Sequence, residues 1–295
     1  MRISTAYQYS TYTSDIQRAQ ESMVNAGEQV STGKRVTKPS DDPLGTSRSL
    51  TLRSYKAATE QYQSNLNVAK GYLGYTEDAI GSTYDLVKSA YSLAVQGANS
   101  ATDQTGRAAM AQQITDLQSR LVSLANTRGP SGQYIFSGQQ ANTQPYTVSG
   151  STITYNGDSN PVYVQVGQND VMQVNSIPEP MFSDIYNKLE TLKNNLNGGN
   201  VGAISGVSIN DMQSAMQTLS AERGNIGGKL QKIDDYTSQY TKRVDDLTTG
   251  ISDIEDVDIS QAIVSYQQAQ NAYQAALNVA SKGFQLSLMD FIQNG

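Results

Sequence analysis

A run of apolar residues at alternating steps of four and three constrains this chain more than any other feature. It extends over residues 212–254, and Arg223 and Thr237 are its non-apolar members. This spacing is typical of a long helix that packs along another helix, as in a coiled coil. A helix of about 45 residues is ~68 Å long, whereas a compact globule of this chain length has a diameter of roughly 50 Å. The pattern therefore predicts an elongated rod.

Helical spacing also predicts helices elsewhere in the chain. A second long helix is expected over residues 44–98, where apolar residues recur every seven positions, and shorter helices are expected over 107–127 and 183–196. Residues 143–176 instead alternate apolar and polar side chains between turn residues, which predicts a small β unit. The Gly- and Asn-rich residues 197–206 are expected to form a loop. The chain is thus expected to run outward, form a β tip and return.

Each end of the chain carries an apolar helical stripe of its own, within residues 9–30 and 259–292. We expect these two helices to pair. Their stripes are poor in large apolar side chains, so burial does not offset the backbone entropy lost on ordering them. The ends are therefore expected to be disordered in the free monomer and ordered by neighbouring copies. The candidate assembly interface comprises Tyr9, Tyr12, Ile16, Met23, Val30, Ile263, Tyr266, Tyr273, Leu277, Phe284, Leu288 and Phe291, and Ala262, Ala269 and Ala276 flank the C-terminal stripe.

The fold class is therefore mainly α: an elongated rod of long, coiled-coil-like helices from both chain halves, with a small inserted β unit. Residues 1–43 and 257–295 are expected to form terminal assembly arms. Residues 44–142 and 177–256 are expected to form the helical rod, and residues 143–176 the β insertion.

Composition excludes most catalytic chemistry. The chain has no Cys and no His, so thiolate nucleophiles, zinc sites and Ser-His-Asp triads are ruled out. Phosphate-loop spacing fails at Gly33 and Gly228, and the acidic residues 253–258 lack the central glycine of a calcium loop. The Asp pairs at 234–235 and 245–246 are interpreted as solvated helix faces. We expect no enzyme activity, no metal, no cofactor and no small-molecule substrate.

Charge and hydropathy also disfavour two kinds of binding partner, nucleic acids and membranes. The net charge of −6 disfavours nucleic acid, and the sequence contains no apolar stretch of membrane-spanning length. The first residues lack the apolar core of a cleavable secretory signal, so export would use another route.

Motifs near both ends resemble those of the flagellin family. Val30–Val36 followed by Asp41–Pro43 resembles the family's N-terminal signature, and Asp258–Ala262 with Gln268–Leu277 and Leu286–Met289 resembles its C-terminal helix. The resemblance covers roughly residues 1–140 and 207–293. The signature loop comprises Gly33, Arg35, Asp41, Asp42 and Pro43, of which Asp42 is expected to cap the next helix, with proline at its first position.

Within that family, Asn126–Gly138 and Thr143–Tyr146 look like the branch of hook-associated proteins at the hook–filament junction. This resemblance implies a structural protein of the bacterial flagellum, outside the cell, that assembles as a homo-oligomeric ring. It implies a neighbouring hook-associated protein on one side and flagellin on the other. It also implies export by the flagellar type III apparatus and an export chaperone at the C-terminal segment.

Two alternatives stay open from the sequence: a flagellin that forms the filament itself, and a cytoplasmic coiled-coil adaptor. Flagellins recognised by the innate immune receptor usually carry an Arg-x-Arg-Glu sequence at the position of Ser89–Ser92, and all three charged residues are absent here. This departure makes receptor recognition weak and favours a junction protein over a filament subunit.

Overall fold

The computed structural model describes the backbone of residues 5–176 and 179–293, and the side chains of residues 7–176 and 179–283. Two compact units make up the chain: residues 1–58 with 242–295, and residues 59–241. We refer to them as the terminal unit and the central unit. The long helices α2 (Pro43–Gly97) and α6 (Ile209–Glu255) contribute residues to both.

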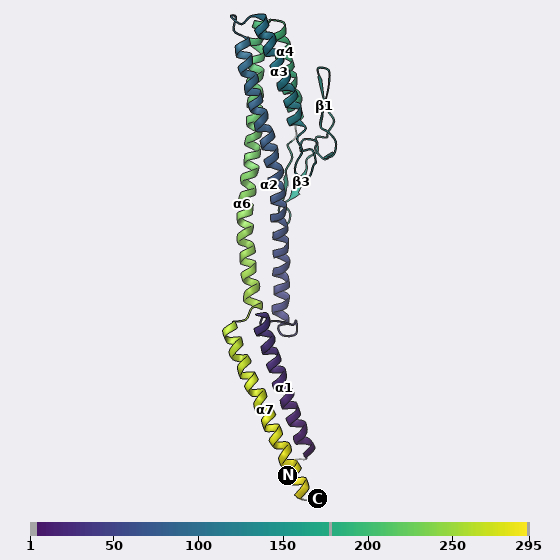
Figure 1. Cartoon of the computed structure of the whole chain (residues 1–295), viewed down its shortest axis with the longest axis vertical. Helices are drawn as coiled ribbons and strands as arrows, with labels where there is room; N and C mark the ends of the chain where they lie inside the picture. The colour runs from purple at the N-terminus through teal and green to yellow at the C-terminus, as the bar shows by residue number, and fades with distance from the viewer. Residues whose placement is uncertain (1–4, 177–178, 294–295) are drawn as a thin grey trace. The chain divides into compact units, whose positions relative to one another are not determined.

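Helices dominate the described residues, as predicted (Figure 1). The others of three turns or more are α1 (Thr5–Thr32), α3 (Gln104–Ala125), α4 (Met181–Asn197) and α7 (Ile259–Gln293). Their bounds lie within about four residues of those predicted. The structure starts α3 three residues earlier than predicted, because Asp103 caps it by accepting a hydrogen bond from the backbone N of Gly106 (2.7 Å). The 47 residues of α6 give a helix about 70 Å long.

The predicted loop at 197–206 is only partly correct. It contains a short helix, α5 (Val201–Ala203), followed by a π-helix, η1 (Ile204–Ser208), that leads directly into α6. Ile204 and Ser208 are fully buried, and Asn195 of α4 donates a hydrogen bond to the Ser208 hydroxyl (3.1 Å). Packing against α4 therefore orders a segment whose glycines and asparagines favour a loop.

The seven-residue repeat of α2 forms the core of the central unit. Its members Leu66, Leu73, Ile80, Val87 and Ala94 are all fully buried. They belong to one hydrophobic cluster with the inward faces of α3, α4 and α6. The helical interpretation of this repeat is confirmed.

The β unit consists of two antiparallel hairpins. Strands β1 (Tyr146–Ser149) and β2 (Thr152–Tyr155) form the first, and β3 (Tyr163–Gln165) and β4 (Val171–Gln173) form the second. Three of these strands match predicted ones. The fourth, β4, was not predicted, because its apolar residues Val171 and Met172 are adjacent and do not alternate with polar ones.

The β unit is not a tip, contrary to the prediction. In Figure 1 it lies alongside the helices of the central unit, and hydrogen bonds hold it there. Asn65 of α2 donates to the carbonyl oxygen of Gln165 (2.8 Å), and Tyr240 of α6 donates to that of Val166. One end of the central unit is formed instead where α3 meets α4, since Gln104 donates to the carbonyl oxygen of Asn197 (2.7 Å).

Across the described helices, we find none that combines the length and the apolar character needed to cross a lipid bilayer.

Candidate assembly interface

Helices α1 and α7 lie side by side in the terminal unit (Figure 1). The predicted stripe of α1 is the face that α7 covers, because Tyr12, Ile16, Met23 and Val30 are half-buried and Ala26 is buried. The predicted pairing of the terminal helices is therefore confirmed.

The matching face of α7 is lined by alanines, of which Ala262, Ala269 and Ala276 were predicted to flank the stripe. Ala262, Ala269 and Ala280 are buried, and Tyr266 and Tyr273 lie between them, half-buried. Together with Ala276 these positions follow steps of four and three, the spacing of a coiled-coil seam. Small side chains allow two helices to approach closely. The α1–α7 contact is therefore made mostly through alanine and tyrosine on the α7 side.

Two tyrosines pack on glycines of the opposite helix. A Cβ added to Gly283 of α7 would lie 2.6 Å from Cε2 of Tyr12, and one added to Gly27 of α1 would lie 3.3 Å from Cε2 of Tyr266. The N-terminal part of α1 thus meets the C-terminal part of α7, so the pair is antiparallel. Each glycine provides the space that a tyrosine ring occupies.

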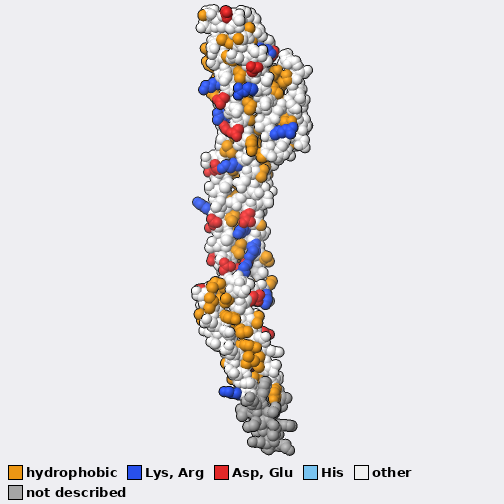
Figure 2. All heavy atoms as spheres, in the orientation of Figure 1, with side chains coloured by type: hydrophobic (Ala, Val, Ile, Leu, Met, Phe, Trp, Pro, Cys, Tyr) orange, Lys and Arg blue, Asp and Glu red, His pale blue; other side chains and the backbone are white. Residues whose placement is uncertain are grey.

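Large aliphatic side chains on α7 stay exposed beside this seam. Ile263 and Leu277, both predicted interface residues, are 42% and 41% exposed, and Val279 is 57% exposed. Tyr9 of α1 is also exposed. Figure 2 shows hydrophobic side chains gathered over the first turns of α7 on the face in view. The side chains of the predicted residues Phe284, Leu288 and Phe291 lie outside the described residues.

The signature loop forms the base of the α1–α7 pair by joining the end of α6. The backbone N atoms of Arg35 and Val36 donate hydrogen bonds to the carbonyl oxygen of Glu255 (2.6 and 3.4 Å). In return, Val257 donates to the carbonyl oxygen of Gly33 (3.0 Å). Gly33 has φ +70°, a conformation that glycine adopts without strain, and this lets the chain leave α1 and pair with residues 255–257.

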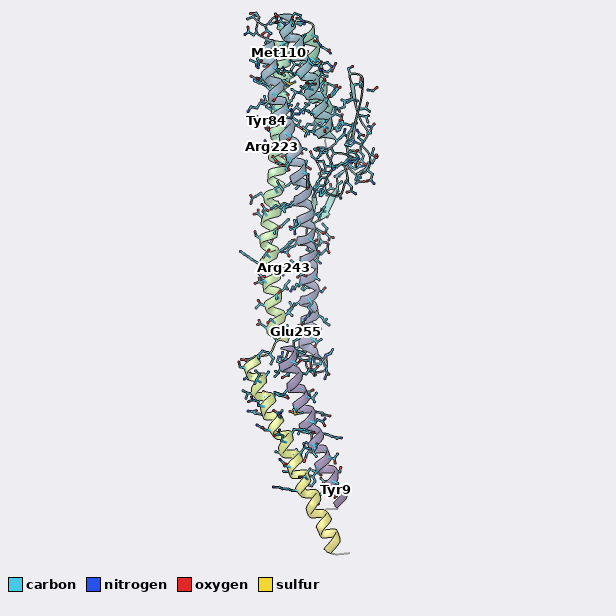
Figure 3. All side chains as sticks on the ribbon, viewed as in Figure 1. Tyr9, Tyr84, Met110, Arg223, Arg243 and Glu255 are labelled. Carbon is cyan, nitrogen blue, oxygen red and sulfur yellow. The ribbon has the colours of Figure 1, made fainter. Side chains whose placement is uncertain are left out.

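The side chain of Glu255 is the centre of this joint, which we call the Glu255 clamp; Figure 3 shows it where α6 ends. Its Oε2 contacts Nζ of Lys34 (2.8 Å) and Nη2 of Arg53 (2.6 Å). Its Oε1 accepts hydrogen bonds from Nε of Arg53 (3.0 Å) and from the hydroxyl of Ser49. A carboxylate thus connects the loop after α1, the first turns of α2 and the last turn of α6.

The clamp shifts the protonation of Glu255. The hydrogen bonds from Arg53, followed by those from Lys34 and Ser49, lower its pKa to about 2, against the opposing effect of burial. Only 12% of the side chain is exposed. Glu255 is therefore charged at neutral pH, and two cations, Lys34 and Arg53, lie against it.

The aspartates of the signature loop act as backbone caps. Asp42 accepts a hydrogen bond from the N of Gly45 (2.8 Å), and α2 begins at Pro43, which confirms the predicted cap. Asp41 accepts hydrogen bonds from the N atoms of Lys38 and Thr37, and these lower its pKa. The guanidinium of Arg35 donates to the carbonyl oxygen of Ile254 (2.7 Å). The loop residues are thus held by local geometry.

Sequence reasoning missed the clamp. It considered Glu255 only as part of an acidic stretch that does not fit a calcium loop, and it gave Ser49 and Arg53 no role. A signal was present: Glu255 is spaced from Ile251 and Ile254 so that it borders the inward face of α6. The pairing itself cannot be read from the sequence, because Lys34 and Arg53 are more than 200 positions away.

Comparison with known proteins assigns the chain to a class. Residues 3–141 match the N-terminal helical region of bacterial flagellin, and residues 209–292 match its C-terminal helical region. The chain belongs to the bacterial flagellin family, whose members are structural flagellar proteins.

Individual relatives narrow the class. The chain is 28% identical to flagellar hook-associated protein 3 of Salmonella typhimurium, over 94% of this chain and 95% of that protein. It is also 28% identical to flagellin A of Helicobacter mustelae, but over only 63% of this chain and 36% of that protein. A solved structure of a flagellar hook-associated protein from Vibrio parahaemolyticus has the same fold, with a TM-score of 0.68 and 22% identity, covering 73% of this chain and all of that one. The prediction of a hook-associated structural protein, rather than a filament flagellin, is therefore confirmed.

Proposed function

We propose that this chain joins the flagellar hook to the filament as a ring of identical copies, assembled through α1 and α7 and without catalysis. The observation that carries the proposal is that α7 presents two different sets of side chains. Alanines and two tyrosines face α1, whereas Ile263, Leu277 and Val279 stay exposed. Aliphatic side chains of this size favour burial by about 1.5–3 kcal/mol each, and neighbouring copies are the surface that would bury them.

The proposal includes marginal order of the two terminal helices in the free monomer. Among the described elements, α1 makes its extensive contacts with α7 alone, so each helix has one partner and keeps most of its surface in water. Neighbours in the ring would supply the remaining burial, and the ordering entropy would then be spent at the assembly site. The Glu255 clamp marks the base from which these arms extend.

Partners follow from the same exposed surface. We propose a neighbouring hook-associated protein on one side of the ring and flagellin on the other. An export chaperone that holds the C-terminal segment would cover the apolar side chains of α7 before assembly. Export without a cleaved signal peptide, to the hook–filament junction outside the cell, completes the proposal.

The test replaces an exposed apolar side chain of α7. Purified Leu277→Asp protein is added to cells that lack this chain and carry bare hooks, and filament growth is counted by electron microscopy. Adding purified protein avoids any effect of the variant on export. The matched control is Gln274→Asp, which places the same charge at a nearby exposed position.

We expect the wild-type and Gln274→Asp proteins to restore filaments and Leu277→Asp to fail, with unchanged helix content of its monomer by circular dichroism. Restoration of filaments by Leu277→Asp at the wild-type concentration would overturn the assignment of α7 as an assembly surface.

A further inference from the structure

The terminal unit separates its charges between two helices. Residues 34–56, in the signature loop and the first turns of α2, hold six basic and two acidic side chains. Residues 242–258, at the end of α6, hold two basic and six acidic side chains. Segments of equal and opposite net charge are thus carried by one chain.

Some of these charged side chains form no ion pair within the described residues. In the clamp, Glu255 forms ion pairs with both Lys34 and Arg53. Arg48 on α2 is exposed and has no ion-pair partner among the described residues, and the same holds for Asp245 and Asp253 on α6.

These unpaired side chains lie away from the contact between α2 and α6. Ser49 on α2 is buried and donates a hydrogen bond to Glu255 of α6. A Cβ added to Gly250 of α6 would lie 3.4 Å from Cδ1 of Leu52. Ser49 and Leu52 thus face α6, and the opposite side of α2 faces away from it. That side borders an open groove of about 600 Å³. The groove is lined by Pro39, Pro43, Thr46, Ser47, Leu50, Thr51, Ser54 and Tyr55.

The outward face of α6 differs in character. Asp245, Thr249 and Asp253 follow each other at four-residue spacing and are all exposed, so they share one side of the helix. Ile259 and Ile263 are also exposed, in the turns of α7 that follow. The exposed aliphatic side chains of α7 thus follow this acidic face along the chain. The groove, in turn, has apolar walls formed by Leu50 and Tyr55. Arg48 precedes the lining residue Thr51 by three positions and therefore shares its side of α2.

We infer that the α2 groove of one copy receives the acidic face of α6 of the next copy, with Arg48 opposite Asp253. The two surfaces are different and complementary, so each copy offers one to each neighbour. Such a heterologous contact closes into a ring or continues as a row of subunits, and opposite potentials fix its register. This inference rests on the proposed function and specifies which surfaces meet in the ring.

The cysteine-free sequence allows a direct test. Thr51→Cys places a thiol in the groove and Thr249→Cys places one on the acidic face. Flagella assembled from a chain with both substitutions are isolated, oxidised and run on non-reducing gels. We expect a ladder of covalent oligomers from the double variant and only monomers from either single variant. A mixture of differently tagged single variants should yield one mixed dimer.

Charge reversal tests the electrostatic part. Arg48→Asp or Asp253→Arg alone should lower the cross-linking yield about 5- to 10-fold, because a repulsion of similar size replaces the attraction. The two reversals in one chain should restore the yield, because every contact regains opposite charges.

Two results would overturn the inference. One is flagella that contain the double-cysteine chain at the normal level and give no ladder, a result that leaves the ring itself intact. The other is cross-linking of the Thr51→Cys chain to itself or to a different flagellar protein. Absence of the wild-type chain from flagella would instead refute the proposed function, and with it this contact.

Discussion

Neutralising Glu255 is the perturbation whose effect the structure determines best. The ordinary glutamate pKa of 4.5 and the value of about 2 in the clamp differ by an amount that corresponds to about 3 kcal/mol. Lys34 and Arg53 are each about half exposed, so solvent screening reduces this contribution to about 2 kcal/mol. Glu255→Gln keeps the shape of the side chain and removes its charge. We therefore expect the clamp to open more easily by about that amount.

Hydrogen exchange at the clamp measures this opening. The amides of Arg35 and Val36 donate to the carbonyl oxygen of Glu255, and they exchange when the loop separates from α6. A loss of about 2 kcal/mol should make both amides exchange about 30-fold faster in Glu255→Gln at pH 7. The matched control is Asp253→Asn. Asp253 lies two positions before Glu255 and its side chain is exposed, so removing its charge should change the exchange of both amides less than about 2-fold. Equal exchange in Glu255→Gln and wild type would refute the reasoning.

Acid should act through the same carboxylate. Its pKa is lower in the folded protein than in the unfolded chain, so its stabilisation is complete above about pH 4.5 and is lost as the pH falls toward about 2. The difference in free energy of unfolding between wild type and Glu255→Gln should therefore be largest at neutral pH and close to zero at pH 2. A difference that stays constant over this range in denaturant titrations would contradict the assigned cause.

Three further substitutions test the packing of the two units. Gly283→Ala should weaken the α1–α7 pair by about 1–3 kcal/mol in the assembled flagellum, because its methyl group would collide with the ring of Tyr12. Gly227→Ala, in open space on α6, should instead stabilise by about 0.5–1 kcal/mol. Thermal unfolding of assembled flagella that ranks the two variants in the opposite order would contradict the packing described. Tyr240→Phe removes the hydroxyl that donates to Val166 and should destabilise the central unit by about 1 kcal/mol, with faster exchange in β3 and β4; unchanged exchange there would mean that this hydrogen bond does not hold the β unit.

The helical part of the fold could be predicted because its cause is local. Leu66, Leu73 and Ile80 recur every seven residues, and every one of them is buried. Caps such as Asp42 act within three residues of their own position, so they too are visible in the sequence. The position of the β unit could not be predicted from the sequence, because Tyr240 and Asn65 hold it through contacts made across long sequence separations.

The site was predicted less completely than the fold. A search for large apolar residues on α7 selected Ile263 and Leu277, which are exposed in the monomer, and gave Ala262 and Ala269 a flanking place although they form the contact with α1. Apolar character alone does not distinguish the side chains that bind the molecule's own helix from those left for a neighbour. On α7 the alanines and the two tyrosines face α1, whereas the aliphatic side chains of Ile263 and Leu277 stay exposed.

Hydrogen exchange of α1 and α7, compared between the free monomer and the assembled flagellum, tests the central claim most directly. We predict fast exchange over residues 7–32 and 259–283 in the monomer and strong protection of the same residues after assembly, with the core of α2 protected in both. Strong protection of α1 and α7 already in the monomer would contradict the claim that neighbouring copies complete the fold of this chain.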